Sequence, residues 1–416
     1  MKFCMRRVVI TGIGVVSPIG IGRNEYWDAL AEGKNGIDFI SAFDAADYRL
    51  NIAGEVRNFD PLLWFDKKEA RHTDRTVQFA EVCARQALEE ANINFTDVDP
   101  YRFGVCIGSG QGGIHTLVDS VTVLSERGEA RVSPFTVPMM IVDMPSGYVA
   151  MKHNAKGPNF SVSSACATAL HSIGEAYHTI VRGDADYMLS GGTEATIIPF
   201  GAASFGATKA ISRNPEAKKA CRPFDADRDG FVLGEGAGVI MLEEYEAAKA
   251  RGAHIYAEIK GYGATCDAYH FTAPDPSGDA TYTAMKLAVE RADWDPKSID
   301  LVNAHGTSTP LNDKMETEAV KRLMGEEAGS RVLVQATKSM IGHALGASGA
   351  LDLIAALMAV DKGIVHQTLN YETPDPECAL NVVAGKAVRA DVRRVIVNAF
   401  AFGGHNAVIA LEKCRD

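Results

Sequence analysis

Short apolar runs that favour β-strands alternate with helix-like segments along almost the whole chain. This alternation is typical of α/β proteins, in which helices cover the faces of a largely parallel sheet. We therefore expect an α/β fold. The predicted strands are 8–10, 103–107, 159–162, 187–190, 239–243, 301–304, 333–336, 395–400 and 407–411, and the clearest predicted helices are 75–91, 167–181 and 350–360.

The two halves of the chain have a similar order of elements. In the first half a strand and a turn lead to Cys166, a long apolar helix and the pair Arg-Gly. In the second half a strand and a turn lead to His343, a long apolar helix and the pair Lys-Gly. The sequence therefore predicts two similar units, 1–250 and 251–416, with Cys166 and His343 placed symmetrically across one cleft.

Composition excludes several classes of protein. The formal net charge of −11 opposes the basic surface that nucleic acids require. No run of about 18 uncharged apolar residues occurs, so we expect no membrane span. The eight cysteines form no CxxC pair and no regular spacing, which favours free thiols in a reducing cytoplasm and predicts no metal site.

Two local motifs imitate known binding loops without completing them. GIGVVS at 12–17 begins like a dinucleotide-binding turn, but its third glycine position is Ser17. DADRDGFVLGE at 225–235 resembles a calcium loop, but the closing glutamate falls one residue early, at Glu235. We therefore interpret the second motif as a charged structural turn and expect neither nucleotide nor calcium binding.

Cys166 stands where a strand-like run becomes a helical one, in the stretch VSSACATALHSIGEA. A helix N-terminus favours a thiolate, because its free N–H groups and its macrodipole stabilise negative charge. Cys166 is therefore a candidate nucleophile. From its position alone, a buried structural cysteine is an equally good interpretation.

The second half supplies three further candidates. His305 ends a strand and is followed by a hydroxyl-rich loop, and the ends of α/β strands are common ligand sites. Lys338 and His343 lie in TKSMIGHALGASGA, with His343 near a helix start that should keep its imidazole neutral. The glycine pair in NAFAFGGHN, at 398–406, could approach a substrate closely.

Together these motifs resemble a known family. SSACATA, FDADRDGFVLGEGAG, NAHGTSTPLND, TKSMIGHALGASGA and NAFAFGGHN occur in this order from Val8 to the last strand. They are similar to the motifs of the elongating β-ketoacyl-[acyl-carrier-protein] synthases, in particular the second synthase of bacterial fatty-acid synthesis. The resemblance implies a thiolase-like fold, a five-layered αβαβα arrangement made of two similar βα halves, and a homodimer.

The resemblance also implies a reaction. Cys166 would take an acyl chain from the phosphopantetheine arm of acyl carrier protein, forming a thioester. His305 and His343 would bind the malonyl carbonyl and stabilise the enolate that decarboxylation leaves. The enolate would attack the acyl carbonyl, whose oxyanion would sit on the backbone N–H groups of Cys166 and Phe402. No cofactor is implied, because phosphopantetheine arrives on the carrier protein.

The remaining roles follow from the same resemblance. Lys338 would organise the site, joined in a buried network by Asp313, Glu316 and Asp352. Thr307 and Thr309 would bind the pantetheine arm. The acyl pocket would be lined by Gln111, Phe205 and Phe402, with Phe402 as a gate. A basic patch for the acidic carrier protein would consist of Lys67, Lys68, Arg71, Arg75, Lys209 and Arg213.

One departure and several alternatives remain. The family usually has N-S-F-G-F-G-G where this chain has Ala399 and Ala401, so we expect a stiffer Phe402 gate. A thiolase would need a second catalytic cysteine where this chain has GGHN, and initiation-type synthases have asparagine at the place of His343. A non-catalytic chain-length subunit would lack Cys166, whereas a polyketide-type ketosynthase fits these motifs as well.

Overall fold

The computed structural model describes residues 6–93 and 98–414. Most strands belong to one continuous sheet, and the others form two small sheets. The strands are β1 (Val8–Ser17), β2 (Gly20–Ile21), β3 (Ile37–Phe39), β4 (Ile52–Gly54), β5 (Phe103–Gly108), β6 (Asn159–Phe160), β7 (Tyr187–Glu194), β8 (Leu233–Gly234), β9 (Gly236–Glu244), β10 (Ala257–Cys266), β11 (Leu301–Asn303), β12 (Leu333–Gln335), β13 (Ile364–Val365), β14 (Asn381–Val382), β15 (Val388–Arg389), β16 (Arg394–Ala401) and β17 (His405–Glu412).

The helices fall mainly between these strands. They are α1 (Arg23–Glu32), α2 (Lys67–Arg71), α3 (Arg75–Ala91), α4 (Ile114–Arg127), α5 (Thr136–Met140), α6 (Met144–Lys152), α7 (Thr168–Arg182), α8 (Pro199–Ala207), α9 (Tyr245–Ala250), α10 (Asp279–Arg291), α11 (Pro310–Met324), α12 (Glu326–Gly329), α13 (Lys338–Ile341) and α14 (Ser348–Lys362). Every strand and helix expected from the sequence is present, with ends shifted by a few residues at most places and β1 extended to Ser17.

The main sheet is mixed, not largely parallel. Its order is β14-β12-β11-β16-β17-β10-β1-β9-β7-β5-β6, with β2 paired to β1. The outer strands β5, β6 and β7 pair in parallel, as do β11, β12, β14 and β16. At the centre β1, β9, β10 and β17 pair only antiparallel. The prediction of largely parallel sheets was wrong here, because β17 returns from β16 through a short turn and β1 pairs antiparallel with the distant strands β9 and β10.

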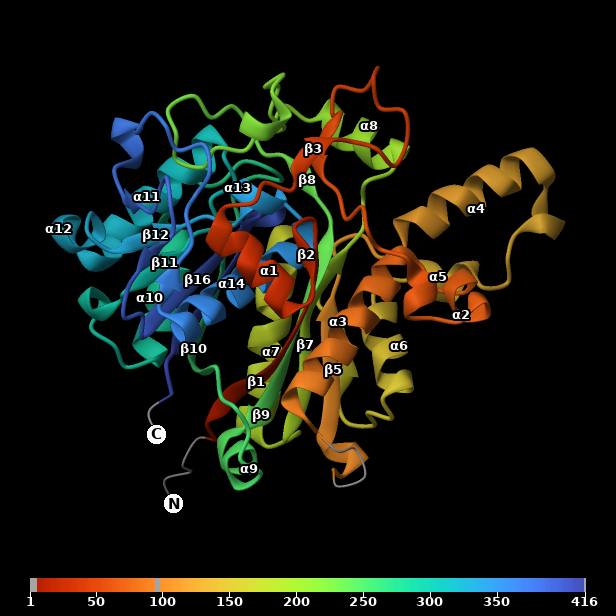
Figure 1. The fold of residues 1–416 in the computed structure, drawn as a ribbon, viewed down its shortest axis with the longest axis horizontal. Helices are drawn as coiled ribbons and strands as arrows, with labels where there is room; N and C mark the ends of the chain where they lie inside the picture. The colour runs from red at the N-terminus through yellow and green to blue at the C-terminus, as the bar shows by residue number, and fades with distance from the viewer. Residues whose placement is uncertain (1–5, 94–97, 415–416) are drawn as a thin grey trace.

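Five layers result from this topology (Figure 1). Helices α3 and α6 pack on the outer face of the first-half strands, and α10 packs on the outer face of β10 and β17, with α11 beside it. Between the two halves lies a middle layer of α7 and α14. Helix α14 contacts β9 on one side and β16 on the other, whereas α7 contacts β5, β7 and β17. This is the expected αβαβα arrangement.

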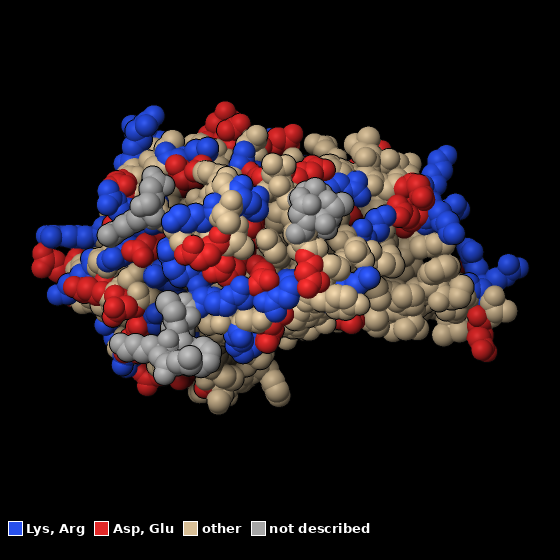
Figure 2. All heavy atoms as spheres, turned by 90° about the horizontal axis from the view of Figure 1, so that it is seen from below, with Lys and Arg blue, Asp and Glu red and all other residues tan. Residues whose placement is uncertain are grey.

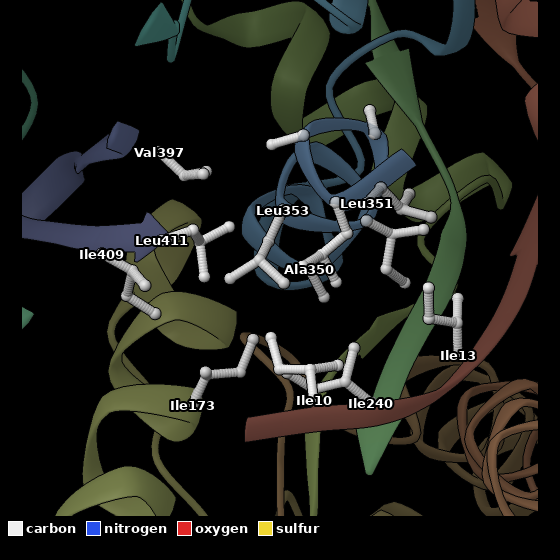
Figure 3. Packing of buried hydrophobic residues seen from close by; sticks show 14 of the residues in the cluster. Ile10, Ile13, Ile173, Ile240, Ala350, Leu351, Leu353, Val397, Ile409 and Leu411 are labelled. Atoms are coloured by element: carbon white, nitrogen blue, oxygen red, sulfur yellow. The ribbon is translucent and has the colours of Figure 1, made fainter. Parts of the chain in front are cut away.

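Helix α14 of the middle layer is buried on every side (Figure 3). All residues of α14 from Ser348 to Val360 are buried, and a helix that is apolar all round belongs in the interior of a protein. Its Leu351 and Leu353 lie in one cluster with Ile173 of α7 and with Ile240 and Ile409 of the flanking strands. This packing fixes both central helices against both halves of the sheet.

The helices α7 and α14 are equivalent elements of the two halves. Each has 15 residues, follows a short 3-10 turn, and ends at a left-handed glycine. The turns are η4 (Ala165–Ala167) and η7 (Leu345–Ala347). Each turn begins with a non-glycine residue at positive φ, 49° at Ala165 and 46° at Leu345. The equivalent of Cys166 is therefore Gly346, and the predicted symmetry between Cys166 and His343 is corrected by three residues.

One helical arm projects from the first half (Figure 1). It consists of α4, the turn that follows it, and α5. Several apolar side chains of this arm are exposed: Leu117, Val121, Leu124, Phe135 and Val137. Within the described residues, no helix combines the length and the apolar character needed to cross a membrane.

The contact between β1 and α3 gives a test of the layer packing. An added Cβ at Gly14 would lie 1.8 Å from the carbonyl oxygen of Cys83, which is backbone and has no room to move. We expect Gly14→Ala to lower the free energy of unfolding by about 3 kcal/mol. At Gly147 in α6 the nearest atom is the Met144 sulfur at 3.8 Å.

Gly147→Ala is the matched control, and we expect it to stabilise the fold by about 0.5–1 kcal/mol. Thermal unfolding midpoints of the two variants measure the difference. Equal midpoints would contradict the close packing of α3 on β1.

Candidate active site

A cavity of about 980 Å³ lies between the two halves and is lined by half of the predicted site residues. Its walls come from η4, η7, β7, α8, the loop after β11 and the segment after β16. Among the residues predicted from the sequence, those that line it are Gln111, Cys166, Phe205, Lys209, His305, Thr307, Thr309, His343 and Phe402. The nucleophile candidate and both imidazoles thus face one space.

Cys166 is the central residue of η4 and is 6% exposed. Burial raises the pKa of its thiol to about 11, while the charge of Lys338 and the N–H of Phe402 act in the opposite direction. The expectation that the helix tip keeps a thiolate is therefore outweighed by burial. At neutral pH the resting side chain is a protonated thiol, with the Phe402 backbone beside it.

His343 is held in one tautomer. Its Nδ1 accepts a hydrogen bond from the Leu345 N–H at 3.3 Å and lies 2.8 Å from Ser348 Oγ. A ring nitrogen that accepts an N–H cannot carry the ring proton, so the proton sits on Nε2. Burial lowers the pKa of His343 well below its ordinary value, and the charge of Lys338 lowers it further. His343 is therefore a neutral imidazole with Nε2–H as its free donor.

His305 lies just after β11 and faces His343, with ring centroids 5.4 Å apart. Its backbone is fixed by Glu316, whose carboxylate accepts the N–H groups of His305 at 2.8 Å and Gly306 at 2.9 Å. Asn398 donates its side-chain amide to the same carboxylate. Burial lowers the pKa of His305 well below its ordinary value, with Lys338 and His343 adding to the effect. The second imidazole is neutral as well.

Lys338 is 1% exposed and pairs with Asp352, with Nζ 2.5 Å from Oδ2. Of the three carboxylates expected around Lys338, only Asp352 contacts it in this way. Glu316 binds the His305 backbone, and Asp313 accepts the Phe224 N–H at 2.9 Å. Asp313 also lies 3.7 Å from the guanidinium of Arg228, a partner distant in the sequence. The carboxylates expected in one network around Lys338 therefore have different partners: Asp352 pairs with Lys338, and Asp313 lies near Arg228.

The predicted pantetheine and acyl positions lie on different walls of the cavity. Thr307 Oγ1 and Thr309 Oγ1 are 2.8 Å apart and face the cavity from the loop that follows His305. Gln111 and Phe205 belong to the wall formed by the loop after β5 and by α8. Ala401 ends β16 in an extended conformation, φ −133°, so alanine fits there without strain.

The predicted basic patch is divided by the fold. Lys67, Lys68 and Arg71 are exposed on α2. Lys209 and Arg213 are exposed near the mouth of the cavity, which Lys209 lines. Arg75 is different, because its guanidinium donates to the buried carboxylate of Glu235 at 2.8 Å and to the Val56 carbonyl. We therefore leave Arg75 out of the carrier-protein patch and assign it to the fold.

The calcium-like motif forms a charged turn. Asp225 is fully buried and accepts the N–H groups of Glu372 and Thr373, and Arg222 pairs with it at 2.9 Å. Arg228 of the same motif pairs with Asp375, with Nη1 2.5 Å from Oδ2. Across 6–93 and 98–414, no group of three or more His, Cys, Asp or Glu side chains is arranged to hold a metal ion.

Sequence reasoning missed Glu194, the last residue of β7. It is fully buried, lines the cavity, and acts on the Cys166 thiol through its charge. Its sequence context, GGTEAT, matches no motif that we could interpret. The available signal was only a carboxylate four residues after the predicted strand 187–190, in a segment otherwise without charge.

Comparison with known proteins agrees with this geometry. Residues 5–248 match the family model of the β-ketoacyl synthase N-terminal domain, and residues 256–372 match that of the C-terminal domain. The 3-oxoacyl-[acyl-carrier-protein] synthase 2 of Staphylococcus aureus (strain N315) is 47% identical over 408 residues, 98% of both chains. The protein of the same name from Synechocystis sp. (strain ATCC 27184 / PCC 6803 / Kazusa) is 45% identical over 409 residues, again 98% of both chains.

A solved structure is similar in fold over nearly the whole length. It is described as a type II polyketide synthase acyl-carrier protein in complex with its ketosynthase bound to the hexaketide. The TM-score is 0.91 at 33% sequence identity, covering 99% of this chain and 100% of the other. With two family models matching in order and relatives at this identity over the full length, the chain belongs to the β-ketoacyl synthase family.

Proposed function

We propose that the protein is a β-ketoacyl-[acyl-carrier-protein] synthase of the second type, which condenses malonyl-ACP with an acyl chain held on Cys166. The products are 3-oxoacyl-ACP and carbon dioxide. The observation that carries the proposal is one cavity lined by a buried thiol and by two neutral imidazoles. A thiol can hold an acyl group, and two neutral N–H donors can stabilise an enolate.

The first half-reaction is transfer of the acyl group. The Cys166 sulfur attacks the thioester carbonyl of acyl-ACP, the pantetheine sulfur leaves, and the Cys166 thiol proton passes to that leaving sulfur. His343 cannot accept this proton at Nδ1, which already accepts the Leu345 N–H. His305 Nδ1 is buried and has no hydrogen-bond partner in the described part of the chain, so it is not blocked in the way that His343 Nδ1 is.

The second half-reaction forms the carbon–carbon bond. Loss of carbon dioxide from the malonyl group leaves an enolate, whose oxygen binds the N–H donors of His305 and His343. Its carbon attacks the acyl-Cys166 carbonyl, and the oxyanion that develops there meets the N–H groups of Cys166 and Phe402. The closeness of the Phe402 N–H to the Cys166 sulfur supports this assignment. Collapse of the oxyanion releases the Cys166 sulfur, which takes up a proton from solvent and returns to the resting thiol.

We propose fatty-acid elongation as the pathway, on the strength of relatives named 3-oxoacyl-[acyl-carrier-protein] synthase 2. A polyketide-type ketosynthase is the second candidate, favoured by the likeness to a ketosynthase bound to a hexaketide. A non-catalytic chain-length role disagrees with the presence of Cys166. No cofactor of its own enters the proposed chemistry, because the carrier protein brings the pantetheine arm.

Acyl carrier protein is the proposed macromolecular partner, and a solved ketosynthase of the same fold is described in complex with one. Acidic and basic side chains alternate over much of the face seen in Figure 2. Attraction for the acidic carrier protein must therefore come from local clusters of basic residues. The exposed residues Lys67, Lys68 and Arg71 on α2, with Lys209 and Arg213 at the mouth, are the proposed contact. Such charges mainly speed the encounter.

We further propose a homodimer. The arm of α4 and α5 exposes five large apolar side chains, and an exposed apolar surface of this kind is typical of an interface. Residues other than Lys, Arg, Asp and Glu also cover the lower right of Figure 2, inside an edge of charged side chains. We also propose that the enzyme works in the cytoplasm, because Cys83, Cys106, Cys166, Cys221, Cys266 and Cys378 are free thiols.

Cys166→Ala tests the assignment of the nucleophile. We expect this variant to keep its fold, to form no acyl-enzyme, and to make no 3-oxoacyl product, because no sulfur remains to carry the chain. The measurement is intact-protein and product mass after incubation with malonyl-ACP and acyl-ACPs of graded chain length. Condensation at the normal rate would mean that the nucleophile is another residue.

The raised pKa of Cys166 predicts an unusual pH dependence of alkylation. Because only the thiolate reacts, iodoacetamide labelling of Cys166 should rise about tenfold for each pH unit from pH 7 toward pH 10, levelling near 11. A free cysteine levels off above about 8.5. Peptide mass mapping separates Cys166 from the exposed Cys266. A plateau at pH 8 would show that the helix tip outweighs burial.

Charge reversal tests the carrier-protein patch. We expect replacing Lys67, Lys68 and Arg71 by glutamate to raise KM for acyl-ACP about tenfold at low salt, with kcat for a small acyl thioester unchanged. Lys386→Glu is the control, because this exposed lysine does not line the cavity. If both variants respond equally, a specific patch on α2 is ruled out.

A further inference from the structure

The tip of α14 repeats the tip of α7 without its nucleophile. Gly346 occupies in η7 the place that Cys166 has in η4. At the catalytic tip the N–H of Cys166 is a proposed donor to the oxyanion. At the second tip the Gly346 N–H already has an acceptor, since it donates to Glu194 Oε2 at 3.0 Å. A protein carboxylate thus occupies the second helix tip.

Each oxygen of the Glu194 carboxylate accepts two hydrogen bonds. Its Oε1 accepts the Ser109 hydroxyl and the Gln111 N–H, each at 3.1 Å. Its Oε2 accepts the Gly110 N–H at 2.9 Å in addition to Gly346. Four donors around one buried carboxyl group favour the ionised form, because a protonated oxygen would face a donor. The residue therefore joins the loop after β5 to the tip of α14.

The two glycines that meet Glu194 are required by the close approach. An added Cβ would lie 2.6 Å from Glu194 Oε2 at Gly346, and 2.7 Å from the same oxygen at Gly110. Any side chain at either position would displace the carboxylate. The backbone at both sites is therefore shaped around Glu194.

In each half, the end of one strand contacts the helix tip of the other half. The end of β7 contacts η7, and the end of β16 contacts η4. Glu194 is the last residue of the eight-residue β7, and Ala401 is the last residue of the eight-residue β16. The end of β16 leads to the Phe402 N–H beside Cys166, whereas the end of β7 supplies an acceptor to Gly346. The end of β16 thus supports the proposed reaction at Cys166, whereas the end of β7 places a carboxylate on the equivalent tip at Gly346.

We propose that Glu194 is a positioning residue for the condensation. It fixes the cavity wall at Gln111 against the turn whose Leu345 N–H sets the His343 tautomer. Its contribution to condensation rests on the proposed function, whereas its effect on the thiol does not.

Few charges act on the thiol in this cavity. Lys338 lowers the pKa of Cys166 and Glu194 raises it, while His305 and His343 are neutral at physiological pH. Burial raises the pKa of Glu194 to about 7, and the four donors act against burial. Removing the carboxylate should therefore make Cys166 more acidic, while shortening it should leave the charge in place.

The test compares Glu194→Gln, Glu194→Asp and Ser109→Ala in the full-length protein. For each variant we would measure the thermal midpoint, the pH profile of Cys166 alkylation by iodoacetamide, and kcat for condensation. Glu194→Gln should shift the alkylation profile down by about half a pH unit or more and lower kcat about tenfold to a hundredfold. Glu194→Asp should lower kcat without this shift, because it keeps the charge and loses reach.

Ser109→Ala removes one of four donors and no charge, so the alkylation profile should stay close to that of the parent protein and kcat should fall less than in Glu194→Asp. An unshifted alkylation profile in a folded Glu194→Gln variant would overturn the electrostatic role. A Glu194→Asp variant with normal kcat would overturn the positioning role, also where Glu194→Gln fails to fold. Alkylation needs no carrier protein, so its outcome is independent of the proposed reaction.

Discussion

The site depends on the meeting of two helix N-termini from opposite halves of the chain. The tips of α7 and α14 both point into the interface, and a helix N-terminus carries partial positive charge. Lys338 adds a full positive charge close by. This environment, together with burial, keeps His305 and His343 neutral. The carboxylates Glu194, Glu316 and Asp352 offset the positive charge through backbone and lysine contacts. An enolate that forms between the imidazoles is therefore received by donors that are already in place.

Much of the fold followed from local pattern. Helix α3 has the predicted bounds, 75–91, because an Asp74 cap precedes an amphipathic run, and α7 and α14 differ from prediction by a few residues. The antiparallel centre was missed because strand direction depends on tertiary pairing. The arm of α4 and α5 was missed because its apolar residues do not face the core of its own chain.

The site was predictable where residues sit in contiguous motifs, and less so where partners come from afar. Cys166, His305 and His343 were found from their motifs, and they line one cavity. Arg75 looked like a surface cation, but its partner Glu235 lies on a different segment and buries its charge. Asp313 was expected beside Lys338, but its carboxylate lies near the guanidinium of Arg228. Glu194 lies in no motif that we interpreted, because its role depends on a hydrogen bond from Gly346 in the other half of the chain.

The strand β1 belongs to both halves at once. It pairs with β9 along most of its length, and its Val8, Val9 and Ile10 also pair with β10. A hinge motion that separated the halves would break this shared strand in the middle of the sheet, at the cost of several buried hydrogen bonds. Entry of a long acyl chain must therefore rely on local movements of the side chains and loops that line the cavity, while the two halves stay joined.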